Sequence, residues 1–226
     1  MRSQEEIDRL RADRGGLWPL IRWIHRRRPI LTNLLVIAAP VYALAARDRP
    51  VDLLDPSRSA LFIVPWLLMI LGVAIRMWGS GNLQKNREIT QTGIYQMVRH
   101  PLYTGSLAFF LAYFLTVSDP AVGVGLFLAL VFLVYYPTML GEEEYLSLRF
   151  PDQAASRARL PRLIPNPLCL PEALRTDRFA LHSAYHNLGV RSLGFLIFLP
   201  LFLKALIWVH SHLNVSISAG NWIGTG

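Results

Sequence analysis

The apolar residues of this 226-residue chain are collected into long blocks, which polar, arginine-rich segments separate. Each block approaches the roughly 20 apolar residues that a helix needs to cross the hydrocarbon core of a bilayer. The pattern therefore predicts an all-α integral membrane protein with about five transmembrane helices, over residues 30–46, 60–78, 102–117, 121–140 and 193–209.

The connection between the third and fourth blocks contains only Ser118, Asp119 and Pro120. Two helices joined by so short a turn must run antiparallel, so we expect a tight hairpin. The first block contains Asn33 and Pro40. Both are tolerable inside a helix bundle, where neighbouring groups satisfy the backbone that they leave unpaired.

Residues 17–28 mix tryptophan and aliphatic side chains with several arginines. This composition favours an N-terminal helix that lies in the membrane interface before the first crossing. Alternatively, the segment is a solvated basic tail. Farther along, after three prolines, residues 172–186 are expected to form a short helix.

The chain divides on this basis into three predicted parts. Residues 1–29 form an interfacial and cytoplasmic segment, and residues 30–165 form the transmembrane core. Residues 166–226 contain a cytoplasmic linker, the fifth transmembrane helix and a C-terminal tail. The polar N-terminus lacks the apolar core of a signal peptide, so we expect it to be retained.

Composition supports a membrane protein, with 53% hydrophobic residues, 17% charged residues and a mean hydropathy of +0.33. The net charge of +8 could indicate a nucleic-acid ligand, but no basic segment has the aromatic interleaving of a nucleic-acid module. We therefore expect no nucleic-acid partner. The single cysteine, Cys169, excludes an internal disulfide.

The distribution of Lys and Arg predicts the orientation of the chain. If the spans alternate, nineteen cations fall on the side of the N-terminus and three fall on the other side, with Lys204 inside the last span. Because cytoplasmic loops are enriched in Lys and Arg, the N-terminus is predicted to be cytoplasmic and the C-terminus external.

This topology brings residues 79–101 and 141–191 to one membrane face. In the first segment, Pro101 fits the first turn of the third span, so Arg99 and His100 lie beside a positive helix N-terminus that suits a carboxylate. Alternatively, Arg99 and His100 anchor lipid headgroups. The Gly79-Ser80-Gly81 sequence is a weak signal, which helix packing or capping can explain.

The second segment begins with three consecutive carboxylates, Glu142, Glu143 and Glu144. Adjacent like charges repel, so they require cations or a positively charged ligand nearby. Alternatively, they form an ordinary solvated helix start, or they pair with Arg99 and Arg149.

Together these motifs resemble the isoprenylcysteine carboxyl methyltransferase and phospholipid methyltransferase superfamily. The resemblance covers residues 76–165. It rests on motifs that keep their order and spacing: Arg76, Gly81, Leu83, Lys85 and Asn86, then Gly93-x-Tyr95, Arg99-His100-Pro101-x-Tyr103-x-Gly105, Glu142-Glu143-x-x-Leu146, Phe150 and Pro161-Arg162-x-x-Pro165. The family usually has a glycine and two spaced tyrosines after the phenylalanine, whereas residues 151–157 contain neither.

The resemblance implies a small membrane methyltransferase that uses S-adenosyl-L-methionine. We expect no metal, because the chain has a single cysteine. The resemblance also implies a cofactor site made of Gly81, Lys85, Tyr95, Arg99, His100, Pro101, Tyr103, Gly105, Glu142 and Glu143. Among these residues, Arg99, His100 and Glu142 are the expected catalytic residues. Glu144, one place beyond the pair, is expected to be only a surface charge.

The expected substrate is a lipophilic carboxylate, amine or thiol, methylated at the cytoplasmic boundary of a bacterial inner membrane, with membrane lipids as further partners. An alternative is a sterol- or steroid-reductase-like enzyme that uses NADPH, because such enzymes have a similar Arg-His-x-x-Tyr-x-Gly motif. The glutamate pair favours the methyltransferase. A non-enzymatic scaffold or small transporter is the third alternative, although only Lys204 lies deep in a span. His210 and His212 have a spacing compatible with a metal but are more typical of an interface. The sequence carries no signal for an oligomeric state.

Overall fold

The computed structural model describes residues 4–12, 15–48, 50–55, 59–84, 89–187 and 189–223. In these residues every regular element is helical, which confirms the predicted all-α class. The longer elements are α1 (Gln4–Ala12), α2 (Trp18–Ala46), α3 (Ser59–Asn82), α4 (Pro101–Val117), α5 (Pro120–Ala129), α6 (Tyr136–Arg149), α7 (Pro151–Arg157) and α10 (Phe195–Ile223). The shorter ones are η1 (Gly93–Gln96), η2 (Leu130–Tyr135), η3 (Pro167–Cys169), α8 (Leu170–Arg175), α9 (Leu181–His186) and η4 (Val190–Gly194).

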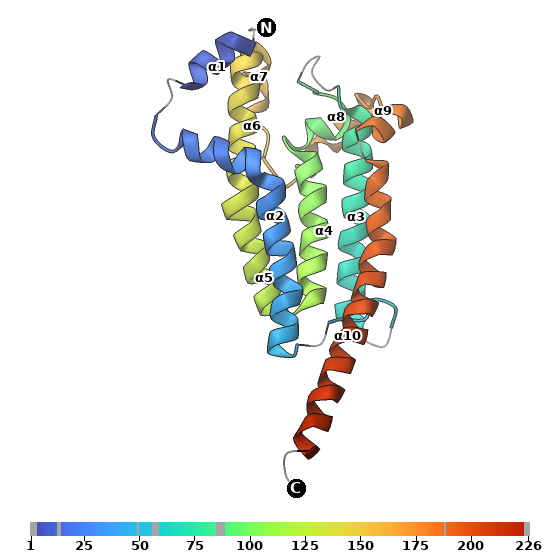
Figure 1. Cartoon of the computed structure of the whole chain (residues 1–226). Coiled ribbons are helices and arrows are strands. Elements are labelled where there is room, and N and C mark those ends of the chain that lie inside the picture. The colour runs from blue at the N-terminus through green and yellow to red at the C-terminus, as the bar shows by residue number, and fades with distance from the viewer. Residues whose placement is uncertain are drawn as a thin grey trace.

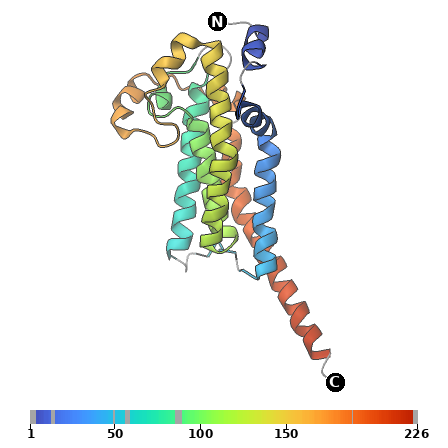
Figure 2. The ribbon, with the colours of Figure 1, turned by 90° about the vertical axis from the view of Figure 1, so that its left-hand side faces the viewer.

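The long helices form an elongated bundle (Figure 1). In the described part of the chain, four segments are long and apolar enough to cross a membrane: Trp18–Ala46, Ile63–Asn82, Pro120–Arg149 and Arg191–His212. The shorter apolar helix α4 runs among them. The predicted number of about five apolar spans is therefore confirmed. Helices α1, α7, α8 and α9 gather at one end of the bundle, which we call the site face (Figure 2).

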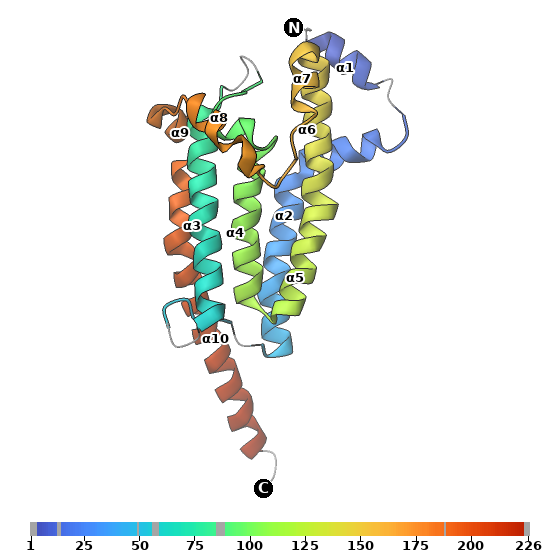
Figure 3. The ribbon, with the colours of Figure 1, turned by 180° about the vertical axis from the view of Figure 1, so that it is seen from behind.

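Helix α2 joins two predicted segments in one bent element. Its first part runs across the bundle, and the helix then turns along it (Figures 1 and 3). The helix contains Pro29 and Pro40. Proline removes a backbone hydrogen bond and clashes with the preceding turn, so it kinks a helix without ending it. The interfacial segment and the first span are thus continuous, and the position of residues 17–28 in the membrane interface stays a prediction.

The hairpin between α4 and α5 is confirmed. The Asp119 carboxylate caps α5 by accepting hydrogen bonds from the backbone N–H groups of Ala121 (2.9 Å) and Val122 (3.4 Å). A Cβ atom at Gly123 would overlap the Phe114 carbonyl, so only glycine permits this close approach of the two helices.

Helices α3 and α4 pack closely through a pair of glycines. A Cβ atom at Gly72 would lie 2.8 Å from the Gly105 carbonyl oxygen, and one at Gly105 would lie equally close to the Gly72 carbonyl oxygen. Small residues let two helices approach in this way when both are apolar. The contact also brings Arg76 of α3 against α4, where its Nη1 donates to the Ser106 hydroxyl (2.6 Å).

The predicted helix over residues 172–186 is wrong in one respect, because residues 176–180 are not helical and separate α8 from α9. The Asp177 carboxylate accepts hydrogen bonds from the Asn82 side-chain amide (2.6 Å) and the Trp78 indole (3.0 Å). Phe179 covers Gly81, where a Cβ atom would overlap its ring. These tertiary contacts fix the break against the end of α3.

At the opposite end of the bundle, the charge inside the last span has a partner. The Lys204 ammonium lies 2.7 Å from the Asp52 carboxylate in the loop between α2 and α3. Long cationic side chains can extend from an apolar helix to reach such a group. Desolvation acts to raise the pKa of Asp52, but the hydrogen bond and charge of Lys204, together with the backbone hydrogen bond from Leu54, lower the pKa overall.

Candidate functional site

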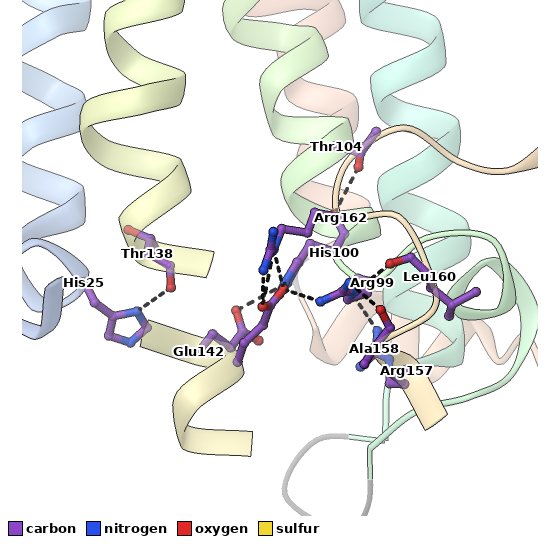
Figure 4. A network of polar contacts seen from close by, with 11 residues as sticks. His25, Arg99, His100, Thr104, Thr138, Glu142, Arg157, Ala158, Leu160 and Arg162 are labelled. Carbon is purple, nitrogen blue, oxygen red and sulfur yellow. Dashed lines mark hydrogen bonds and ion pairs between the residues drawn. The ribbon is translucent and has the colours of Figure 1, made fainter. Parts of the chain in front are cut away.

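Both polar segments singled out in the sequence meet at the site face. The first comprises the residues at the start of α4, and the second lies on α6 and the chain that follows α7. Arg99, His100 and Arg162 lie close together there (Figure 4). All three contact one carboxylate, that of Glu143. The prediction that these segments share one face is therefore confirmed.

The start of α4 is held by the chain around residues 161–163. Backbone N–H groups of Arg99 and His100 donate to the carbonyl oxygens of Pro161 (2.9 Å) and Arg162 (3.2 Å). The Thr104 hydroxyl donates to the Leu163 carbonyl oxygen (2.7 Å). These bonds explain why the Pro-Arg motif accompanies the Arg-His-Pro motif so far away in the sequence.

Glu143 is the centre of the charge cluster. Its carboxylate accepts from Arg162 through Nε (3.1 Å) and Nη2 (3.1 Å), from Arg99 through Nη1 (3.2 Å), and lies 3.1 Å from His100 Nε2. The hydrogen bond from Glu143 raises the pKa of the Arg162 guanidinium. A carboxylate with so many charge-assisted partners is fully engaged within the protein. Glu143 therefore fixes the positions of Arg99 and His100.

Glu142 has a different environment, although it is the next residue. Its side chain is 38% exposed, and its Oε2 lies 3.9 Å from His100 Nδ1. It also interacts with the Tyr103 hydroxyl. His100 thus has one ring nitrogen directed to each of two carboxylates, and only Glu142 retains oxygen capacity for a ligand.

The expectation that Glu144 is a surface charge is wrong. Its side chain is 0% exposed and forms ion pairs with Arg11 Nε (3.3 Å) and Arg22 Nη1 (3.4 Å). In a helix, residues two positions apart point to nearly opposite sides, so Glu142 and Glu144 cannot share an environment. Glu144 faces the N-terminal helices and binds them to α6. Close by, His25 Nδ1 lies 3.2 Å from the Thr138 carbonyl oxygen (Figure 4).

A cavity of about 720 Å³ opens beside the cluster. Its outer part, next to the site face, is lined by residues that include Tyr95, Arg99, His100, Pro101, Glu142, Tyr145, Arg149, Phe150 and Arg157. Its inner part extends between the long helices and is lined by Arg28, Thr32, Asn33, Arg76, Ser106 and Tyr135. Tyr103 lines it between the two parts, and its ring stacks on His100 with centroids 5.5 Å apart. The volume lies within the usual range for small-molecule sites.

Two arginines of the outer part retain unused hydrogen-bonding capacity. In the described residues, the Nε atoms of Arg149 and Arg157 are buried without a hydrogen-bond partner. Arg157 stacks over the Tyr95 ring at 5.5 Å and donates to the Arg99 carbonyl oxygen. Burial lowers the pKa of the Arg157 guanidinium, although Tyr95 and Glu142 act in the opposite direction. Burial likewise raises the pKa of Tyr95.

Most of the predicted site residues lie at the cavity, but not all of them do. Six line it: Tyr95, Arg99, His100, Pro101, Tyr103 and Glu142. Glu143 borders an adjoining hollow of about 290 Å³, together with Arg99 and His100. Gly81 and Gly105 lie instead at close contacts with Phe179 and with α3, outside the lining. Lys85 falls outside the described residues.

Several cavity residues were not singled out from the sequence, namely Arg28, Tyr135 and Arg157. In the sequence, Arg28 is one of many basic residues before the first span, and nothing distinguishes it from the others. Tyr135 reads as part of an apolar block, and it lies in the π-helical stretch η2 between α5 and α6. Such stretches change the direction of side chains within a long helix and are frequent at functional sites.

In the described residues, no three His, Cys, Asp or Glu side chains lie close enough together to hold a metal ion. Of the two histidines noted in the last span, His212 has its Nδ1 2.8 Å from the Trp208 carbonyl oxygen.

Part of the chain that forms this site matches a known protein family. Residues 59–153 match the model of a family described as phospholipid methyltransferase, which confirms the resemblance identified from the motifs. The chain is 29% identical over 110 residues to the nickel-cobalt-cadmium resistance protein NccN of Alcaligenes xylosoxydans xylosoxydans, covering 47% of this chain and 51% of that protein. It is 31% identical over 113 residues to the cobalt-zinc-cadmium resistance protein CzcN of Cupriavidus metallidurans, covering 46% and 51%. The chain thus spans about half the length of these curated relatives, and no solved structure matches it significantly.

Proposed function

We propose, from the match of residues 59–153 to the phospholipid methyltransferase family, that this chain is a membrane methyltransferase that uses S-adenosyl-L-methionine. Its acceptor is a lipophilic molecule that reaches the site from the bilayer, and the site face lies at the cytoplasmic boundary. One observation carries the proposal: His100 and Glu142, from two distant motifs, line a single cavity of about 720 Å³ that extends from the site face into the bundle.

The outer part of the cavity fits the chemistry of the cofactor. S-adenosyl-L-methionine carries a sulfonium, an ammonium, a carboxylate and an adenosyl group. Glu142 has oxygen capacity for the ammonium or the ribose hydroxyls. The unpaired Nε atoms of Arg149 and Arg157 suit the carboxylate, and the rings of Tyr95, Tyr145 and Phe150 provide surfaces for the adenine.

When bound, the cofactor supplies an activated methyl carbon, so the protein has mainly to bind, align and desolvate the reactants. We assign Glu142 to cofactor binding and His100 to the boundary between cofactor and acceptor. The Arg99 guanidinium is held by Glu143 and by the carbonyl oxygens of Leu160 (2.6 Å) and Ala158 (2.7 Å). We therefore assign Arg99 as a positioning residue.

The need for a base depends on the acceptor. A carboxylate is already ionised at neutral pH and releases no proton, whereas an ammonium must first lose one. His100 Nε2 is occupied by Glu143, and its Nδ1 faces Glu142 and the cavity. If the acceptor is an amine, His100 Nδ1 is the group that takes this proton.

The NADPH-dependent reductase alternative makes a different prediction, which calorimetry of the detergent-purified protein tests directly. S-adenosyl-L-methionine and S-adenosylhomocysteine should bind, and NADPH should not. Glu142→Gln should weaken cofactor binding about tenfold or more, because it removes the carboxylate from a charge-assisted contact. Glu172→Gln is the matched control, since Glu172 is exposed on α8 outside the cavity. Binding of NADPH in place of S-adenosyl-L-methionine would establish the reductase.

A further inference from the structure

Two arginines line the inner part of the cavity, inside the bundle. Arg76 lies on α3, six residues before the helix ends at the site face, which is about 9 Å along the axis at the helical rise. Arg28 lies on α2, next to Pro29. Both are half-buried, and they are close enough for their charges to repel. Arg28 lies just before the predicted first span, whereas Arg76 lies within the second, where charged side chains are rare and typically mark ligand sites.

Neither arginine has an anionic partner among the residues that the structure describes. Arg76 Nη1 donates to the Ser106 hydroxyl (2.6 Å) and the Leu102 carbonyl oxygen (3.3 Å), which are both neutral. Arg28 Nη1 donates to the Tyr103 hydroxyl (2.7 Å), and its guanidinium lies 5.3 Å from the centre of that ring.

Two other charges on the long apolar helices, Lys204 on α10 and Arg22 on α2, differ in this respect. Lys204 pairs with Asp52, and Arg22 pairs with Glu144. A buried charge is costly without a counter-charge. Arg28 and Arg76 therefore leave an excess of positive charge that a ligand can neutralise.

Apart from Glu142, which interacts with the same Tyr103 hydroxyl that Arg28 contacts, the surroundings of the two arginines are polar and uncharged. The inner lining adds the side chains of Thr32, Asn33, Ser106 and Tyr135. These groups can donate hydrogen bonds to an oxyanion, and guanidinium groups match the geometry of phosphate and carboxylate. An amine would meet two like charges in the same space.

The inner part is also accessible from the side of the bundle. It is walled by α2 and α3, with α4 between them (Figures 1 and 3). Pro29 and Asn33 of α2 line it and are exposed. Ile37 and Val41 continue the same face of α2 at helical spacing and are exposed as well. An apolar chain lying on this face would have its polar end beside Asn33.

We propose that the inner part of the cavity binds the anionic headgroup, a phosphate or a carboxylate, of a single-chain or double-chain lipid between Arg28 and Arg76. The lipid tail lies along the exposed face of α2. The binding site stands on these contacts alone. The further statement that this lipid is the methyl acceptor rests on the proposed function.

Calorimetry of the purified full chain in detergent tests the site with three probes of equal chain length: oleate, oleoyl lysophosphatidate and oleyl alcohol. At least one anionic probe should bind about tenfold or more tightly than the alcohol, since only an anion pairs with the guanidinium groups. The tighter of the two anionic probes identifies the headgroup class. Equal binding of all three probes would contradict the proposal.

Variants locate the binding. Arg76→Gln and Arg28→Gln, made separately, should each weaken binding of the anionic probe about tenfold and leave binding of the alcohol unchanged. Arg76→Lys should retain most of the affinity for the anionic probe. Arg175→Gln is the control, because Arg175 is exposed on α8 away from the cavity. Anion binding that survives both glutamine variants would overturn the site.

A parallel titration with S-adenosyl-L-methionine separates the two proposals. Anion binding without cofactor binding would sustain the lipid site and refute the methyltransferase. If the protein binds the cofactor but binds the anionic probes no more tightly than the alcohol, the methyltransferase proposal is sustained and the lipid site is refuted.

Discussion

His100 contacts two adjacent carboxylates, which differ in their other partners and in their exposure. Glu143 bonds to Arg162, Arg99 and His100, and 21% of its side chain is exposed. Glu142 is more exposed and has its longer contact to the same ring. Two consecutive residues thus differ in role: the Glu143 carboxylate holds other side chains in place, and the Glu142 carboxylate is available to a ligand.

This difference predicts opposite phenotypes for the same substitution. Glu143→Gln should lower the free energy of unfolding by about 2 kcal/mol, because hydrogen bonds to charged groups contribute about that much. Glu142→Gln should leave stability nearly unchanged and weaken cofactor binding. Chemical unfolding in detergent, beside calorimetry, measures both quantities. A Glu142 variant that is less stable than the Glu143 variant would refute this division.

The adjacent glutamates also show what residue patterns can and cannot reveal. The order of the motifs along the chain correctly indicated that His100 and the glutamate pair lie close together. The burial of Glu144 could not be inferred, because its partners Arg11 and Arg22 lie on α1 and α2, more than a hundred positions away. Which face of α6 those helices cover is decided only by tertiary packing.

At the scale of elements, the contact between α3 and α4 carries Arg76 to the cavity. Gly105, which the motif suggests for the cofactor site, lies in that contact instead of the lining. Arg76 Cγ would lie 2.6 Å from a Cβ atom at Gly105. The glycine is therefore required by helix packing, which in turn positions the inner part of the cavity.

Gly105→Val should consequently lower the free energy of unfolding by about 1–3 kcal/mol, the usual effect of overpacking. Gly125→Val is a matched control, since nothing lies within 4 Å of a Cβ atom at Gly125 on α5. Thermal unfolding of both variants in detergent makes the comparison. Equal stability of the two variants would show that the close contact of α3 and α4 is not required.

Element boundaries were predictable where local chemistry decides them. The Ser118-Asp119-Pro120 turn predicted the hairpin, and Asp119 does cap α5. The non-helical residues 176–180 were not predictable, since Asp177 is held by Trp78 and Asn82 of a distant helix. The continuity of α2 through Pro29 was missed for the same kind of reason, because packing against α6 can support a kinked helix.

At the scale of the whole molecule, the apolar blocks predicted the bundle, and the arginine count predicts its orientation. The single Cys169 lies at the site face, on η3. A membrane-impermeant thiol reagent should therefore label the protein in inverted vesicles and not in intact spheroplasts. A Cys169→Ser, Asp55→Cys variant should give the reverse, since Asp55 lies in the exposed loop at the opposite end. Labelling of Cys169 in intact spheroplasts would show that the orientation is the opposite of the predicted one.

The whole molecule joins a polar site face to a cavity that reaches between apolar helices. Under the proposed function, a water-soluble cofactor and a membrane-embedded acceptor approach this cavity from different directions. The central claim is that the two meet at His100 and Glu142.

Transfer of label from methyl-labelled S-adenosyl-L-methionine to an organic-extractable product tests that claim most directly. Purified chain supplied with a bacterial membrane lipid extract should produce labelled lipid. Glu142→Gln should reduce the rate at limiting cofactor by about tenfold or more, and Glu172→Gln should not. A wild-type protein that binds S-adenosyl-L-methionine yet transfers no label, or a Glu142→Gln protein with the wild-type rate, would contradict the account.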